Sequence, residues 1–139
     1  MRSLALAALL LAALAGSAVA ATDPWATRAN AVCRSWVPRQ KAAFAGLKAP
    51  KTKADAYRFL LVARPLEVGL LRDLRAIKVA RSPAAERALA AAAHDVVELD
   101  AARAAYRGDT KPFLRLFTRW VTDERATKAF SAAGAADCA

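Results

Sequence analysis

Residue types that carry out catalysis are sparse in this sequence. His94 is the only histidine among 139 residues, and Cys33 and Cys138 are too far apart to form a C-x-x-C redox motif. His94 points away from the apolar stripe of its segment, where Glu98, four residues on, offers an exposed contact rather than a catalytic partner. Two cysteines and one histidine are also few for a metal site, and no C-x-x-C-H haem motif is present. The sequence therefore predicts neither an enzyme nor a bound cofactor.

Cations at helical spacing are the first candidates for binding. Lys111, Arg115 and Arg119 lie four residues apart and would share one helix face. A second series, seven residues apart, consists of Arg34, Lys41 and Lys48. If the two segments are neighbours, these residues would form a basic strip that contacts an anionic surface. The alternative is a solvated face that only keeps the protein soluble.

A second candidate is a ligand pocket in the most apolar part of the chain. Arg64 and Glu67 flank Pro65 there, and Pro38 interrupts the preceding segment. Prolines inside helices remove backbone hydrogen bonds and open gaps, where an Arg side chain would hold a carboxylate ligand. The expected pocket residues are Trp36, Tyr57, Arg64 and Trp120. The alternative is that Arg64 pairs with Glu67 or reaches solvent.

The first 20 residues are typical of a secretory signal peptide. Arg2 precedes a run of only Leu and Ala over residues 4–14, and Ala18-Val19-Ala20 matches the small-x-small cleavage pattern. Cleavage is expected after Ala20, with Ala21 as the alternative. The apolar run is too short for a membrane anchor, and Ser17 stands where a lipoprotein carries its lipidated Cys. We therefore expect a mature chain from residue 21 that is secreted or periplasmic, soluble and not lipidated.

The mature chain remains strongly basic. Removing the signal takes away only Arg2, which leaves 21 Lys and Arg against 12 Asp and Glu. An exported protein rarely meets nucleic acid, so this charge is expected to face anionic lipid, wall polymer or an acidic protein. No nucleic-acid partner is predicted.

Alanine-rich composition and helix start signals predict an all-α fold. The chain contains 39 Ala, the best helix former, against only five Gly and six Pro. The expected helices run from Asp23-Pro24 to about Leu47, from Thr52 to about Val79, from Ser82-Pro83 to Gly108, and from Asp109 to Gly134. Pro38 is expected to kink or split the first helix, and Pro65 to bend the second.

Four helices with short connections pack most simply as an antiparallel up-down-up-down bundle. Residues 21–139 would form this single domain. An exported chain with two cysteines usually pairs them, and the start of the first helix would meet the end of the fourth at one end of the bundle. We therefore predict one disulfide between Cys33 and Cys138, with redox catalysis and metal ligation as the unsupported alternatives.

Several short motifs resemble a group of bacterial proteins. They are Asn30-Ala31-Val32-Cys33, Ala63-Arg64-Pro65-Leu66, Gly108-Asp109 and a Cys at the extreme end. In this order they resemble small exported two-cysteine helical proteins of GC-rich, actinobacterial-type bacteria, which have no assigned activity. The resemblance implies export and the disulfide bridge, and it implies no catalytic residues.

Together these observations predict a non-enzymatic binding protein of the cell envelope. Its partner would be an anionic surface or a protein, contacted through the basic strip. The alternative function is a carrier of a small amphipathic or carboxylate ligand in the bundle interior.

Overall fold

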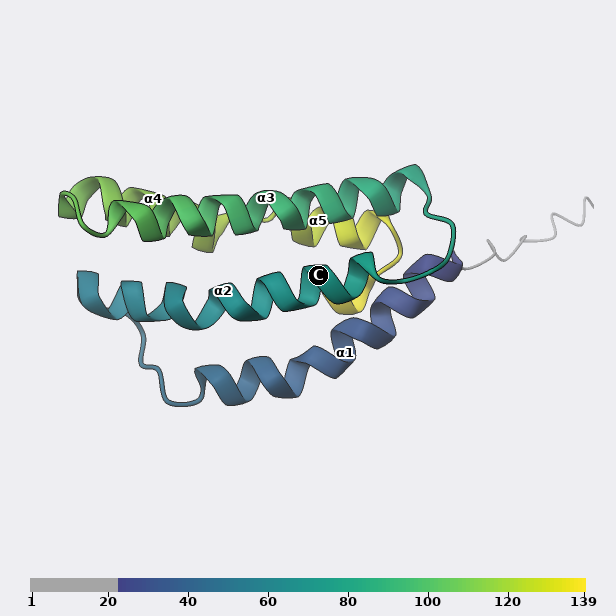
Figure 1. The fold of residues 1–139 in the computed structure, drawn as a ribbon, viewed down its shortest axis with the longest axis horizontal. Helices are drawn as coiled ribbons and strands as arrows, with labels where there is room; N and C mark the ends of the chain where they lie inside the picture. The colour runs from purple at the N-terminus through teal and green to yellow at the C-terminus, as the bar shows by residue number, and fades with distance from the viewer. Residues whose placement is uncertain (1–22) are drawn as a thin grey trace, which may run out of the picture.

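The computed structural model describes residues 23–139, and the predicted signal peptide lies outside this range. Within it the chain is all-helical, which confirms the all-α part of the fold prediction (Figure 1). The elements are α1 (Pro24–Phe44), α2 (Lys53–Arg75), α3 (Pro83–Ala105), α4 (Thr110–Thr122), α5 (Arg125–Ala132) and the short 3-10 helix η1 (Ala136–Cys138). None of these described helices is both long enough and apolar enough to cross a bilayer.

Side-chain caps explain where the first three helices begin. The Asp23 carboxylate accepts a hydrogen bond from the Trp25 amide at 2.8 Å. Thr52 and Asp55 form the predicted reciprocal capping box, and the Ser82 hydroxyl accepts from the amide three residues on. These caps satisfy backbone donors that a helix start would otherwise leave unpaired. The start signals read from the sequence are therefore confirmed for α1, α2 and α3.

The two internal prolines do not end their helices. Pro38 lies inside α1 and Pro65 inside α2, and both helices continue through them. The predicted split of the first helix is therefore not observed. Each proline removes one backbone hydrogen bond without ending the helix.

The segment expected to be one helix from Asp109 to Gly134 is two helices. Asp123 ends α4 with extended backbone geometry, ψ 119°. Its carboxylate accepts from the Arg125 amide at 2.9 Å and so satisfies the first amide of α5. Asp competes in this way with helical hydrogen bonding because its short side chain reaches nearby backbone amides. The apolar stripe continues across this break, which is why periodicity alone did not locate it.

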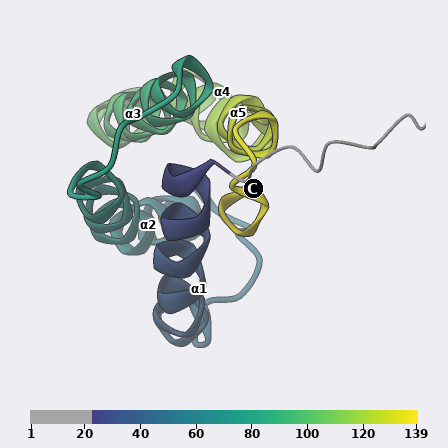
Figure 2. The same ribbon diagram turned by 90° about the vertical axis from the view of Figure 1, so that its right-hand side faces the viewer.

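Helix α3 lies at the centre of the packing. It contacts α2 on one side and the consecutive helices α4 and α5 on the other, while α1 packs on α2 and on η1. Figure 2 shows η1 lying between α1 and α5. The described core has two parts, one around the disulfide and one at the opposite end. Their largest buried residues are Trp25, Leu74, Leu99, Leu60 and Phe113.

The predicted disulfide between Cys33 and Cys138 is present, with 5.2 Å between the two Cα atoms. Polar contacts hold the same junction: Asn30 donates to the carbonyl of Gly134 at 3.2 Å and accepts from the Asp137 amide at 2.9 Å. The C-terminal segment is thus fixed against α1 by one covalent bond and several hydrogen bonds.

Close contact between α1 and α2 depends on Gly69. The Trp36 indole covers this glycine and donates to Asp73 at 3.0 Å. A Cβ atom at position 69 would lie 2.4 Å from Cη2 of Trp36. A larger residue here would therefore force the indole away from α2.

We predict that Gly69→Ala destabilises the protein, because overpacking usually costs about 1–3 kcal/mol. This cost should exceed the roughly 1 kcal/mol that Ala gains over Gly in a helix. Urea denaturation followed by circular dichroism measures the difference. Gly46→Ala is the control, because a Cβ there meets nothing within 4 Å. A Gly69→Ala protein more stable than the wild type would show that Trp36 does not require the glycine.

Candidate functional site

Cations from two distant parts of the sequence meet at the end of the molecule opposite the disulfide. The connection from α1 to α2, the start of α2 and the turn from α3 to α4 all lie at this end (Figure 1). Nζ of Lys53 donates to the carbonyl of Gly108 at 2.7 Å and so joins the two segments. We call residues 41–58 and 103–115 the basic pole. They hold nine Lys and Arg side chains against two Asp.

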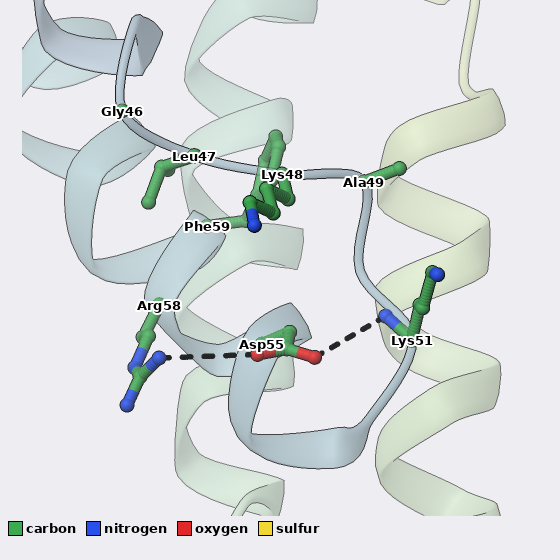
Figure 3. A pocket seen from close by; sticks show the side chains of 8 residues that line it. All are labelled: Gly46, Leu47, Lys48, Ala49, Lys51, Asp55, Arg58 and Phe59. Carbon is green, nitrogen blue, oxygen red and sulfur yellow. Dashed lines mark hydrogen bonds and ion pairs between the residues drawn. The ribbon is translucent and has the colours of Figure 1, made fainter.

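A hollow of about 400 Å³ opens on this pole (Figure 3). Lys48, Lys51 and Arg58 are among its lining residues, and Asp55 is its only acid. Figure 3 shows Arg58 and Lys51 on opposite sides of Asp55. Hydrogen bonds from the Thr52 hydroxyl and from the backbone amides of Lys51 and Thr52 lower the pKa of Asp55. Its charge is therefore balanced locally, and the surrounding side-chain ammonium groups face solvent.

The three predicted anion-contacting residues on α4 do not behave alike. Lys111 and Arg115 are exposed and form no ion pair with any residue in the range 23–139. Arg119 instead turns toward α3, where its Nε lies 3.1 Å from Oε1 of Glu98. Lys111 and Arg115 thus belong to the basic pole, whereas Arg119 is held by an internal carboxylate.

The expected strip along the first helix is also divided. Arg34 pairs with Asp137 beside the disulfide, and only Lys41 and Lys48 reach the basic pole. Because α1 packs on α2 and η1, the pole arises from the ends of four helices and their connections rather than from α1 and α4 lying side by side.

The four residues predicted to line one ligand pocket lie in separate places. Trp36 is buried between α1 and α2, and the Tyr57 ring stacks on Tyr106 with 3.9 Å between centroids. Arg64 forms two hydrogen bonds with Asp100, at 2.7 and 3.1 Å. Trp120 lines a different hollow on α4. Arg64 is therefore already paired with a carboxylate of the protein itself.

An ion cluster surrounds the break between α4 and α5. Glu98 is only 6% exposed, and its Oε1 lies 3.0 Å from Arg125 and 3.1 Å from Arg119. Arg125 also binds Asp123, and this hydrogen bonding lowers the pKa of Asp123 to about 2. Ligand atoms of His94, Glu98 and Asp123 lie within 4.8 Å of one another, as a metal site requires. The Arg125 guanidinium, however, already bridges the two carboxylates, so this side chain supplies the positive charge of the cluster.

Glu67 on α2 and Asp95 on α3 form an acid pair that was not predicted from the sequence. Burial, followed by repulsion from Asp95, raises the pKa of Glu67 to about 7. Burial and the charge of Asp123 raise the pKa of Asp95 to about 6. Oε2 of Glu67 and Oδ1 of Asp95 are shut off from solvent and meet no hydrogen-bond donor in the described chain.

A sequence signal for Glu67 existed. It occupies a core position of α2, in register with Leu60, Ala63, Leu71 and Leu74. An acid at such a position must either find a cation or stay protonated. The possible local pair with Arg64 obscured this signal, because Arg64 is bound to Asp100 instead.

The comparisons with known proteins give no further assignment. None of the protein-family models, curated proteins or solved structures compared with this chain matches it.

Proposed function

We propose that this protein is exported and acts outside the cytoplasm as a non-enzymatic module that binds an anionic partner. The proposal rests on one observation, the concentration of cations at the basic pole. Residues 41–58 and 103–115 hold nine of the chain's 22 Lys and Arg side chains but only two of its 12 acids. The positive electrostatic potential of such a cluster attracts an anionic surface and orients the protein toward it.

The proposed location also rests on the signal-like leader and on the disulfide. A bridge between Cys33 and Cys138 is compatible with an oxidising compartment outside the cytoplasm. There the available polyanions are lipid head groups, wall polymers and acidic proteins. We further propose that the helices pack as an antiparallel up-down bundle. In this bundle α4 and α5 together take the place of the fourth helix, and the basic pole lies at one end.

Among these anions we favour a surface of anionic lipid or wall polymer. The basic pole contains two features, the broad hollow and an exposed apolar side chain on α4. This side chain is Leu114, at 40% exposure. Lys111 and Arg115 flank Leu114 in the sequence. A cationic rim with an apolar side chain between its charges suits an interface with lipid head groups.

We expect the protein to bind phosphatidylglycerol vesicles at low ionic strength and to dissociate as salt increases, because salt screens exposed charge pairs. The test variant is Lys48→Ala/Lys51→Ala/Lys111→Ala. Each cation near an anionic surface contributes roughly 1 kcal/mol, so this variant should bind at least about tenfold more weakly. Sedimentation with vesicles measures the binding.

The matched control removes three exposed cations at the other end of the molecule, in Arg28→Ala/Arg75→Ala/Lys78→Ala. Both triple variants carry the same net charge, so only a localised site distinguishes them. The affinity of the control should stay within about twofold of the wild type, because exposed charges away from the site change the binding free energy by only a few tenths of a kcal/mol. Equal losses in the two variants, or no binding to vesicles or to a soluble anionic wall polymer at low salt, would contradict the proposal.

A further inference from the structure

A cleft of about 190 Å³ lies between α2, α3 and α5, close to the disulfide. Its walls are mainly apolar and include Leu70, Leu71, Leu74 and Phe130. Glu67 and Asp95 are its two acidic lining residues. The cleft is separate from the basic pole, and the inference below does not depend on the anion binding proposed above.

The same two acids also line a second hollow of about 380 Å³, whose walls include Phe44, Phe59 and Trp120. Glu67 and Asp95 therefore stand where the two hollows adjoin. A ligand head group placed between the two carboxyl groups has hydrocarbon walls on one side and aromatic rings on the other.

Glu67 and Asp95 differ from the other acids in the middle of the molecule. Each of the others is held by at least one arginine: Asp100 by Arg64 and Arg103, Glu98 by Arg119 and Arg125, and Asp123 by Arg125. Neither Glu67 nor Asp95 has an ion pair with any described residue, and this distinguishes them from the other three. Each also has one buried oxygen without a donor, as does Glu98. Leaving such groups without partners is costly. In their ionised forms the two carboxylates would be satisfied by a cationic hydrogen-bond donor placed in the cleft that both of them line.

The geometry and the charges specify one class of ligand. A primary ammonium group offers three N–H donors and a positive charge to two carboxylates. The leucine walls require an apolar tail, and the cleft of about 190 Å³ has room for a short aliphatic chain. We propose that this cleft binds a small aliphatic ammonium ion, with its head group between Glu67 and Asp95 and its tail against Leu71, Leu74 and Phe130.

The proposed ligand is opposite in charge to the carboxylate ligand expected from Arg64. A carboxylate in this cleft would be repelled by both acids, and Arg64 is occupied by Asp100. A metal ion would satisfy the carboxylates but would leave the apolar walls uncovered. Only an organic cation uses both features of the cleft.

Binding should strengthen with rising pH. Both acids have pKa values raised by burial, so acidic solution keeps them neutral and removes the attraction. Other charged groups face the pair from the neighbouring helices: His94, Glu98 and Asp100 on α3, Asp123 after α4 and Arg125 on α5. The three acids among these groups are paired with Arg64, Arg119 or Arg125, which leaves Glu67 and Asp95 as the acids at this site without an ion pair.

The test is titration of the intact protein with n-hexylammonium, followed by NMR shifts of residues 67–74 and by calorimetry. We expect binding at pH 8 that is at least tenfold tighter than at pH 5. Hexanol and hexanoate, with similar tails but neutral or negative heads, should bind at least tenfold more weakly. Glu67→Gln and Asp95→Asn should each reduce the affinity for hexylammonium about tenfold. Glu86→Gln, an exposed acid on α3, is the matched control and should leave it unchanged.

Three results would overturn the inference. They are hexanol binding as tightly as hexylammonium, unchanged affinity in Glu67→Gln, or no saturable binding at pH 8. Thermal unfolding of each variant verifies that it is folded, and amide replacements conserve the shape of both side chains. The triple variant of the basic pole should still bind hexylammonium, which separates this site from the proposed anion-binding surface.

Discussion

Replacing both bridged cysteines in Cys33→Ala/Cys138→Ala is expected to lower the free energy of unfolding by about 4 kcal/mol. The bridge closes a loop of 105 residues, so its loss restores nearly the full conformational freedom of the unfolded chain. For a domain of this size the unfolding midpoint should fall by roughly 15 °C. Alanine is chosen because Cys33 is buried, at 3% exposure, and a serine hydroxyl there would lack a partner.

Wild-type protein treated with a reductant is the control, and it should unfold at nearly the same temperature as the double variant. Hydrogen exchange should show which part opens first. The contacts of α1 outside the disulfide are mainly with α2 and η1, so the amides of η1 and of the first half of α1 should lose most protection. A midpoint change below about 4 °C would indicate that packing, not the bridge, closes the fold.

Glu67→Gln is expected to stabilise the protein at pH 8 by about 2 kcal/mol. The pKa of Glu67 rises from 4.5 to about 7 in the folded state, so folding opposes its ionisation. A raised carboxyl pKa means that the folded state binds the proton more tightly than the unfolded chain. Its stabilising contribution is complete below about pH 4.5 and is lost as the pH rises to about 7. A glutamine has no charge to bury and avoids that loss.

The measurement is urea denaturation of both proteins at pH 4.5, 6 and 8. The difference in free energy of unfolding between the variant and the wild type should be near zero at pH 4.5 and largest at pH 8. Subtracting one curve of unfolding free energy against pH from the other cancels the contributions of acids with lowered pKa values, such as Asp55 and Asp100. Both proteins contain these acids. Glu124→Gln, an exposed acid, should leave the curve unchanged within about 0.5 kcal/mol. A destabilised Glu67→Gln protein at pH 8 would mean that ionised Glu67 has a favourable partner in the fold.

Local signals in the sequence were sufficient for the starts of α1, α2 and α3. Asp23, Thr52 and Ser82 act within three residues of their own position, so their effect does not depend on the rest of the fold. The disulfide followed from compartment and parity, because only two cysteines were present to pair.

The break at Asp123 and the arrangement of charges depend on tertiary contacts and were harder to predict. Arg125 binds both Asp123 at the break and Glu98 on α3, and this bridging stabilises the kinked connection. Likewise, the sequence offered Arg64 a partner three residues away, whereas folding brings it to Asp100 on α3. A helical wheel shows the face of a side chain but not which neighbouring helix meets that face.

The basic pole was predicted only in part, for a related reason. Lys111 and Arg115 were identified from their spacing on α4, but their neighbours come from the loop after α1 and from the end of α3. The bond between Lys53 and Gly108 that joins these segments links residues 55 positions apart. Charge counting identified a basic protein, and only the fold shows where the charge collects.

The position of the disulfide also determines how the domain responds to mechanical force. Tension applied across residues 23 and 139 would pass from Cys33 directly to Cys138, since the bridge joins them. Residues 34–137 would carry none of that tension, and only the ten residues before Cys33 would unravel, extending by about 35 Å. After reduction the same pull would extend the whole chain to about 400 Å. The covalent bridge therefore makes most of the folded domain inextensible between its ends, as long as its surroundings remain oxidising.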